Sequence, residues 1–218
     1  MDTNKPTIVY RYRDGLYVNL TNRCPTACVF CIKTAWKMDY RGSDLNLGGA
    51  EPAPAEIIAL AKKEWEASQF RELVFCGFGE PTMRLEAMLA CARLIRNGRA
   101  EPLPRNLRIR LNTNGLANAV WGRNVVPEMK GLIDSVHVSL NTADPAQWAA
   151  LMRPMEPWAA TGFEKVKEFI REAALLLPEA FATAVDSGDV DLEKFKELAA
   201  RLGAEPRVRP RLEEEGKK

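Results

Sequence analysis

Three cysteines near the start of the chain, Cys24, Cys28 and Cys31, have the spacing C-x3-C-x2-C. Three thiolates at this spacing can hold three corners of a cubane iron-sulfur cluster and leave the fourth iron open for another ligand. Clusters that only transfer electrons usually have four cysteine ligands. The missing fourth cysteine therefore predicts chemistry at the iron.

Two other uses of these cysteines fit their spacing less well. A zinc site would need a fourth ligand such as His137, the only histidine, whereas structural zinc sites normally have two close ligand pairs. A disulfide framework is disfavoured because five cysteines is an odd number and no charged segment followed by an apolar one marks the chain for export. We expect reduced thiols in a cytoplasmic protein, with Cys76 and Cys91 as small buried residues.

The length and composition fit one compact domain. The chain has 218 residues, of which 46% are hydrophobic and 28% charged, and we expect a domain over 1–212 with a charged, disordered tail over 213–218. A net charge of +2 with acids and bases interleaved gives no electrostatic evidence for nucleic acid or anionic lipid as a partner. No apolar run approaches the ~18 to 20 residues of a membrane helix.

Short apolar runs alternate with helical patterns, which is typical of β-α repetition. The predicted strands are 16–21, 72–76, 107–112, 135–141, 180–185 and 205–208. Helices are predicted over 54–65 and 84–97, and after the capping signals Asp144, Thr161 with Glu164, and Asp191. Parallel strands covered by helices are the economical arrangement.

Several predicted strands have one apolar and one polar face. In the fourth strand, Val136 and Val138 oppose His137 and Ser139, and the first and third strands alternate in the same way. A sheet with helices on both faces should be apolar on both, so a repeated polar face predicts a curved sheet around a polar lumen, a partial parallel (β/α)6 barrel. The alternative is a solvent-facing sheet edge or an antiparallel face.

Three further segments lie at the ends of predicted strands: Gly-Phe-Gly-Glu-Pro-Thr over 77–82 and Asn-Thr-Asn-Gly over 112–115 follow the second and third strands, and Ser-Leu-Asn over 139–141 ends the fourth. With the cysteine motif, their order and spacing resemble the radical S-adenosylmethionine (SAM) superfamily, and the segment 15–47 is most similar to small members associated with TatD-type nucleases. In β-α folds the ligand lies at the carboxyl ends of the strands, where all four motifs are expected.

The resemblance implies a 4Fe-4S cluster on the three cysteines and SAM as second cofactor. The residues it implies for SAM binding are Phe30 beside the adenine, Gly77, Phe78, Gly79 and Glu80 near the methionine half, Asn112 and Asn114 in the turn, and Ser139 and Asn141 on the ribose. Gly79 lacks a Cβ, so its backbone can approach a ligand closely. Phe78 departs from the pattern, because the family commonly has glycine there.

The implied reaction is reductive cleavage of SAM to a 5′-deoxyadenosyl radical, which removes hydrogen from a small substrate, with an anion as one candidate. A reductant such as flavodoxin or ferredoxin is implied, and a functional link to a TatD-type nuclease. One alternative is an iron-sulfur electron carrier or sensor. A second is an activase of glycyl-radical enzymes or a deazapurine synthase, although Asn112 and Lys33 differ from the residues typical of those groups.

Candidates for the substrate end come from outside the motifs. The long loop 34–50 carries Trp36 and could act as a lid or simply cover the sheet. Arg110 and Arg153 could bind an anionic substrate, or one of them the carboxylate of SAM. His137 could be catalytic or a satisfied polar core residue.

Overall fold

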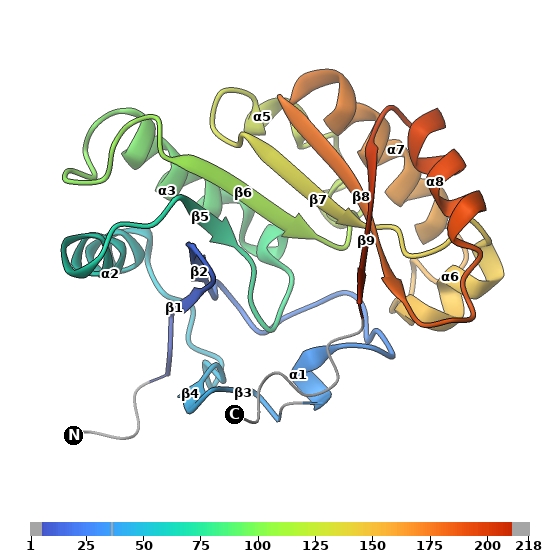
Figure 1. The fold of residues 1–218 in the computed structure, drawn as a ribbon, viewed down its shortest axis with the longest axis horizontal. Coiled ribbons are helices and arrows are strands. Elements are labelled where there is room, and N and C mark those ends of the chain that lie inside the picture. Colours follow the sequence, from blue (N-terminus) through green and yellow to red (C-terminus); the bar gives the residue numbers. More distant parts are fainter. Residues whose placement is uncertain (1–5, 36, 211–218) are drawn as a thin grey trace. The chain divides into compact units, whose positions relative to one another are not determined.

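The computed structural model describes residues 6–35 and 37–210, so Trp36 and the predicted tail over 213–218 lie outside the described residues (Figure 1). The strands are β1 (Val9–Tyr12), β2 (Gly15–Val18), β3 (Asp39–Tyr40), β4 (Ser43–Asp44), β5 (Glu72–Phe75), β6 (Arg108–Thr113), β7 (Ser135–Ser139), β8 (Glu179–Asp186) and β9 (Glu205–Pro210). The helices are α1 (Ile32–Ala35), α2 (Pro54–Ala67), η1 (Pro81–Arg84), α3 (Leu85–Arg96), α4 (Ala117–Trp121), α5 (Val126–Met129), α6 (Pro145–Met152), α7 (Gly162–Leu176) and α8 (Leu192–Arg201).

The main sheet has the strand order β1-β2-β5-β6-β7-β8-β9. The pairs β2–β5, β5–β6, β7–β8 and β8–β9 are parallel, and β1 pairs antiparallel with β2. The prediction of an α/β fold with a mainly parallel sheet is therefore confirmed, and each predicted strand is present with shifted ends. Strand β1 and the hairpin of β3 and β4 were not predicted.

The chain divides into two compact units. Among the described residues, the first unit contains 6–23 and 32–111, and the second contains 24–31 and 112–210. Strand β6 begins in the first unit and ends in the second. A single domain over 1–212 stays a prediction.

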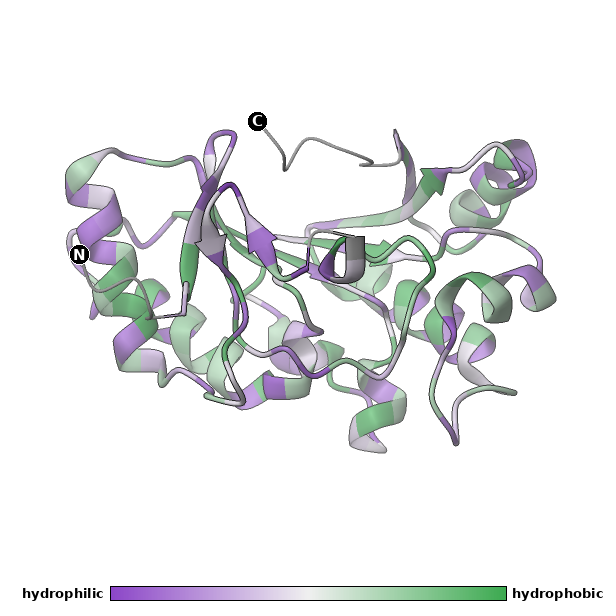
Figure 2. Cartoon of the chain, turned by 90° about the horizontal axis from the view of Figure 1, so that it is seen from below, coloured by the Kyte–Doolittle hydropathy of each residue, from purple (hydrophilic) through white to green (hydrophobic). Residues whose placement is uncertain are grey.

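In the first unit, helices α2 and α3 pack against each other, and α2 also contacts β1 and β2. Helix α3 buries the residues that recur at helical spacing, namely Leu85, Met88, Leu89, Ala92 and Ile95. Helix α2 begins with Pro54 in its first turn, where the missing N–H costs no hydrogen bond. Apolar and polar segments alternate along the helices, as expected for helices with one buried face (Figure 2).

In the second unit, two predicted helix caps are confirmed and one is wrong. The Asp144 carboxylate accepts from the Gln147 amide at 2.7 Å, and Asp191 does the same for Lys194 at 3.0 Å. Thr161 makes no side-chain cap, because its backbone is already helical (φ −112°, ψ −12°). A Cβ on the next residue, Gly162, would lie 3.0 Å or less from the Trp148 ring, so close packing determines this helix start.

No helix in the described part of the chain combines the length and apolar character needed to cross a bilayer.

Candidate functional site

The segment 24–31, called the cluster loop below, brings two of its thiols to one hydroxyl. The sulfur atoms of Cys24 and Cys28 lie 3.2 and 3.4 Å from the Thr26 Oγ1, and the Cys31 amide donates to the Cys28 carbonyl at 3.1 Å. All three cysteines are partly exposed and none is in a disulfide. Burial raises the pKa of the Cys28 thiol to about 12, and the hydrogen bond with Thr26 acts in the opposite direction. Metal binding therefore has to displace the proton from this sulfur.

The cluster loop is held by backbone hydrogen bonds to the end of α6 and the segment that follows it. The amides of Ala27 and Val29 donate to the carbonyls of Arg153 and Leu151 at 3.0 and 2.9 Å. The Met155 amide donates back to the Pro25 carbonyl at 2.9 Å. Thr26 and Pro154 form an isolated antiparallel bridge between the two segments. Arg153 contributes its carbonyl from a left-handed conformation (φ 45°), and its side chain is exposed.

The turn after β6 places an amide beside the first cysteine. Asn114 Nδ2 donates to the Cys24 sulfur at 3.7 Å, while its Oδ1 accepts from the Leu116 amide at 2.9 Å. Gly115 has φ 82°, and a Cβ there would lie within 3.0 Å of both Val138 and Val166. Only glycine fits this position, so the turn that orients Asn114 is fixed by backbone geometry. Asn112, also predicted for SAM, is half-buried near the end of β6.

The end of β7 carries the two residues that were predicted to bind ribose. Ser139 is the last residue of the strand and is half-buried. Asn141 is 1% exposed and left-handed (φ 64°); its Oδ1 accepts from the Val185 amide at 3.2 Å, and its Nδ2 lies 3.1 Å from the Met152 sulfur. His137 lies two residues before Ser139 in β7. It is buried and packs edge-on against Phe181, with ring centroids 4.7 Å apart.

In the first unit, the segment 77–80 lies against the residues that precede the cluster loop. The Glu80 amide donates to the Arg23 carbonyl at 2.8 Å. A Cβ on Gly79 would lie closer than 3.0 Å to the carbonyl oxygens of Thr21 and Arg23, and one on Gly77 would meet Asn19. Both glycines are therefore required by close backbone approach.

The other two residues of that segment serve local packing. The Glu80 carboxylate is buried and accepts from the Thr82 amide and hydroxyl at 3.1 and 2.7 Å, which caps η1. Phe78 is 2% exposed and belongs to an apolar cluster with Tyr40 and Leu45. This packing explains why the chain has phenylalanine where the family commonly has glycine.

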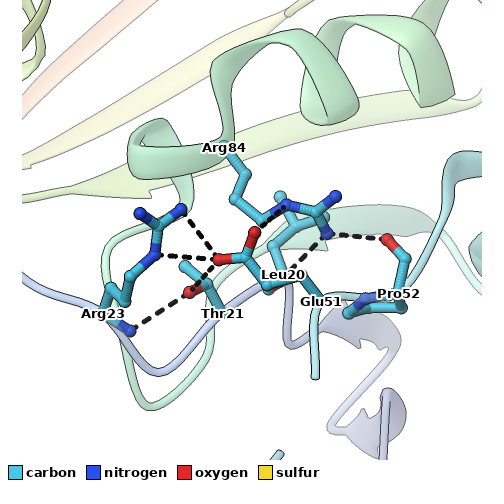
Figure 3. Close-up of polar contacts among 6 residues, drawn as sticks. All are labelled: Leu20, Thr21, Arg23, Glu51, Pro52 and Arg84. Atoms are coloured by element: carbon cyan, nitrogen blue, oxygen red, sulfur yellow. Dashed lines mark hydrogen bonds and ion pairs between the residues drawn. The ribbon is translucent and has the colours of Figure 1, made fainter. Parts of the chain in front are cut away.

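A carboxylate outside every motif joins three segments of the first unit (Figure 3). Glu51 accepts from the Thr21 hydroxyl at 3.1 Å and from the Arg23 guanidinium at 2.8 Å, and its other oxygen lies 3.2 Å from Arg84 Nε. Arg84 also donates to the Pro52 carbonyl at 2.7 Å. Glu51 thus holds the turn before Cys24 to Arg84.

The loop 34–50 is anchored at its base. The hairpin of β3 and β4 turns at Arg41 and Gly42, both with positive φ, as in a type I′ turn. Asn22 accepts from the Leu47 amide at 2.7 Å and donates to the Leu45 carbonyl at 3.0 Å. Asn19 donates to the same carbonyl at 2.8 Å. The segment 45–47 is therefore attached to the residues that connect β2 to the cluster loop.

Arg110 has a carboxylate partner in its own sheet. Its guanidinium contacts the Glu72 carboxylate at 2.7 and 3.1 Å and donates to the Tyr17 hydroxyl at 2.9 Å. The register places Tyr17 and Arg110 on the same face of β2 and β6, which is the polar face predicted from their alternation. Burial raises the pKa of Tyr17 to about 12, although Arg110 acts in the opposite direction.

The thiols suit a multi-iron cluster better than a single ion. No three His, Cys, Asp or Glu side chains within 6–35 and 37–210 converge as a lone metal ion would require, and this finding gives no support to zinc with His137. Three thiols in one short loop, with an amide donor beside Cys24, are soft ligands of the kind that iron-sulfur clusters use, and a four-iron cluster spaces its ligands more widely than one ion does. The residues present therefore fit such a cluster.

The profile of the radical SAM superfamily matches residues 18–202. The chain belongs to the radical SAM superfamily. Its cofactors are accordingly a 4Fe-4S cluster and SAM, as predicted. Among curated relatives, a GTP 3′,8-cyclase of Corynebacterium glutamicum (strain R) is 29% identical over 145 residues, covering 66% of this chain and 35% of the relative. A PqqA peptide cyclase of Methylobacterium sp. (strain 4-46) is 27% identical over 196 residues, covering 87% of this chain and 44% of the relative.

Solved radical SAM structures share the fold. One, described as "Native anSMEcpe with bound AdoMet and Cp18Cys peptide", has a TM-score of 0.60 at 18% identity and covers 93% of this chain and 53% of that chain. The radical SAM methyltransferase TsrM from Kitasatospora setae, with cobalamin and a 4Fe-4S cluster bound, has a TM-score of 0.55 at 12% identity and covers 95% and 41%. The chain thus spans less than half the length of the curated radical SAM relatives it matches.

Sequence reasoning missed several residues that hold the radical SAM motifs in place. Thr26 bridges two thiols, Met152 lies between Cys28 and Asn141, and Glu51 orders the turn before Cys24. Thr26 alone had a local signal, because it lies between two of the cysteines. The other two meet their partners only through tertiary contacts, at separations of 124 residues for Met152 and Cys28 and 28 for Glu51 and Arg23.

Proposed function

We propose that this protein is a radical SAM oxidoreductase or lyase in which Cys24, Cys28 and Cys31 hold the 4Fe-4S cluster. When bound, the reduced cluster and SAM supply a 5′-deoxyadenosyl radical that removes a hydrogen atom from the substrate. The observation that carries the proposal is the cluster loop itself, with three partly exposed thiols and no fourth cysteine within the loop. Its backbone hydrogen bonds to residues 151–155 orient the loop.

The chain's own residues orient SAM in this proposal. Gly77 and Gly79, with the backbone of Phe78 and Glu80, take the methionine half, which is supported by their lack of room for a Cβ. Asn112 and Asn114 belong to the turn that faces Cys24, and Ser139 and Asn141 offer hydroxyl and amide groups to the ribose at the end of β7. Phe30, half-buried in the cluster loop, flanks the adenine.

The substrate is a small molecule or a peptide. Two curated relatives are cyclases, one named for GTP and the other for the PqqA peptide, and the first solved structure contains a peptide. The argument for an anion from Arg110 is weakened by its pairing with Glu72, so the exposed side chain of Arg153 is the better candidate. Trp36 and His137 remain candidates of lower rank, the former outside the described residues and the latter buried beside Phe181.

Anaerobic reconstitution separates the enzyme from its alternatives. The protein with an intact cluster, SAM and dithionite should form 5′-deoxyadenosine, measured by mass spectrometry, because the open iron is available to SAM. An iron-sulfur carrier or sensor with the same cluster would form none. Addition of GTP, a PqqA peptide or fractionated anaerobic lysate should then increase 5′-deoxyadenosine where the true substrate is present. Activase and deazapurine-synthase activities predict a response only to a glycyl-radical enzyme or to a deazapurine precursor.

The cellular setting belongs to the same proposal. The cluster needs an electron donor, for which flavodoxin or ferredoxin is the natural class, and reduced thiols fit a cytoplasmic protein. The proposed link to a TatD-type nuclease rests on the sequence segment 15–47 alone. Copurification of that nuclease with the tagged protein would support the link, and its absence at native expression levels would remove it.

A further inference from the structure

Cys28 lies opposite Met152, the last residue of α6, where backbone hydrogen bonds attach the cluster loop to residues 151–155. The residues on either side of Cys28 donate their amides to the carbonyls on either side of Met152, with Ala27 bonded to Arg153 and Val29 to Leu151. These two hydrogen bonds flank Cys28 and Met152, and the sulfur atoms of the two residues lie 3.7 Å apart.

The same thioether contacts the residue proposed for the ribose. Met152 Sδ lies 3.1 Å from Asn141 Nδ2, and the other end of that amide accepts from the Val185 amide at 3.2 Å. Met152 is 0% exposed and Asn141 is 1% exposed, so no water competes for the contact. The amide orientation follows from this pair of contacts, because a flipped amide would set two donors, Nδ2 and the Val185 N–H, against each other.

Ordinary core packing would not need sulfur at this position. Leucine has about the volume of methionine and stabilises a core equally well. Leucine offers no acceptor for an amide N–H, and it lacks the polarizable atom that methionine places against another sulfur. The thioether is therefore the feature of Met152 that both neighbours use.

We infer that Met152 is a positioning residue that couples the cluster ligand Cys28 to the ribose-binding amide of Asn141. The inference rests on the proposed function, since it takes Cys28 as an iron ligand and Asn141 as a SAM contact. Met152 acts through these two side chains: it fixes the amide of Asn141 in one orientation and sets the surroundings of the Cys28 sulfur.

The test compares two methionines that differ in their neighbours. Met129, at the end of α5, is also 0% exposed and lies in the same unit. SAM binding to the reconstituted, unreduced protein is measured by calorimetry, and the EPR signal is recorded after reduction. Met152→Leu should raise the dissociation constant of SAM about three- to tenfold, as expected for one hydrogen-bonded contact, and should alter the EPR signal at unchanged iron content. Met129→Leu should leave both as in the wild type.

A double variant tests the coupling itself. If Met152 acts through Asn141, the fold-loss of SAM affinity in Asn141→Ala should not be multiplied by adding Met152→Leu. The inference would be overturned if the double variant lost SAM affinity by the product of the two single losses. It would also be overturned if Met152→Leu matched Met129→Leu in SAM affinity and EPR signal. Because a wild type that binds neither cluster nor SAM contradicts the proposed function instead, the two failures are distinguishable. If Met152→Leu fails to fold, Met152→Gln replaces it in the test. The glutamine side chain restores an acceptor for Asn141, so this variant should bind SAM with wild-type affinity. A folded Met152→Gln protein with weakened SAM binding would also count against the inference.

Discussion

At the scale of single residues, reactivity depends on what surrounds each sulfur atom of the cluster loop. Cys24 has the amide of Asn114 beside it, Cys28 has the hydroxyl of Thr26 and the thioether of Met152. Hydrogen bonds to the sulfurs of a cluster stabilise the reduced, more negative state and raise the reduction potential. Cys24 and Cys28 share the Thr26 hydroxyl but differ in their second neighbour, which is an amide for Cys24 and a thioether for Cys28.

The first prediction concerns the ligands. Cys28→Ala should abolish the 4Fe-4S cluster, because the loop has no cysteine besides Cys24, Cys28 and Cys31 to replace the lost ligand. Iron, sulfide and EPR assays on the reconstituted protein measure this. Cys76→Ala is the matched control, since Cys76 is also partly exposed and in no disulfide. A full cluster in Cys28→Ala would contradict the assignment, and cluster loss in Cys76→Ala would add an unexpected ligand.

The second prediction concerns the amide beside Cys24. Asn114→Asp keeps the oxygen that accepts from Leu116 but removes the donor to sulfur, so the reduction potential should fall. One hydrogen bond of about 0.5 to 1.5 kcal/mol corresponds to about 20 to 65 mV for one electron. Asn118→Asp, which makes the same charge change on α4, is the control. Redox titration with equal potentials for the two variants would show that Asn114 does not act on the cluster.

At the scale of elements, tertiary contacts decide what local patterns leave open. The sequence predicts β2 through residue 21, but the strand ends at Val18, because Asn19 and Asn22 turn their side chains to the segment 45–47. The helix caps at Asp144 and Asp191 are local and were predictable. The start of α7 was not predictable from local sequence, because it is set by the packing of Gly162 against Trp148.

Glu51 gives the third prediction. Glu51→Gln should weaken SAM binding several-fold with the cluster retained, since the turn of Thr21 and Arg23 supports the backbone of Gly79. Loss of the partly exposed ion pairs should also lower stability by about 1 kcal/mol. Calorimetry with SAM and thermal unfolding measure the two effects. Glu64→Gln removes a comparable ion pair with Arg11 and should leave SAM affinity unchanged. Equal SAM affinities in Glu51→Gln and Glu64→Gln would show that Glu51 contributes to stability but not to SAM binding.

The fourth prediction uses the close approach at Gly79. An added Cβ would meet two carbonyl oxygens, so Gly79→Ala must displace the segment 77–80 and should abolish measurable SAM binding. Gly131→Ala is the control: its Cβ would meet nothing within 4 Å, and its positive φ should cost only about 1 kcal/mol of stability. Wild-type affinity in a folded Gly79→Ala protein would show that the segment does not contact SAM.

At the scale of the whole molecule, the chain carries the core of the superfamily. The family profile covers residues 18–202, and the chain spans 35% and 44% of two curated relatives. The motifs and the parallel sheet could be predicted because each is written in consecutive residues. The substrate could not, since side chains that face it come from loops without a fixed spacing, as the pairing of Arg110 with Glu72 illustrates.

Three cysteines are proposed to hold a 4Fe-4S cluster and to leave one iron for SAM. EPR spectra of the reduced, reconstituted protein during titration with SAM can detect SAM at that iron. The signal should change with added SAM and saturate at one SAM per cluster. An intact 4Fe-4S signal that stays the same at saturating SAM would show instead that all four irons are closed to the cofactor.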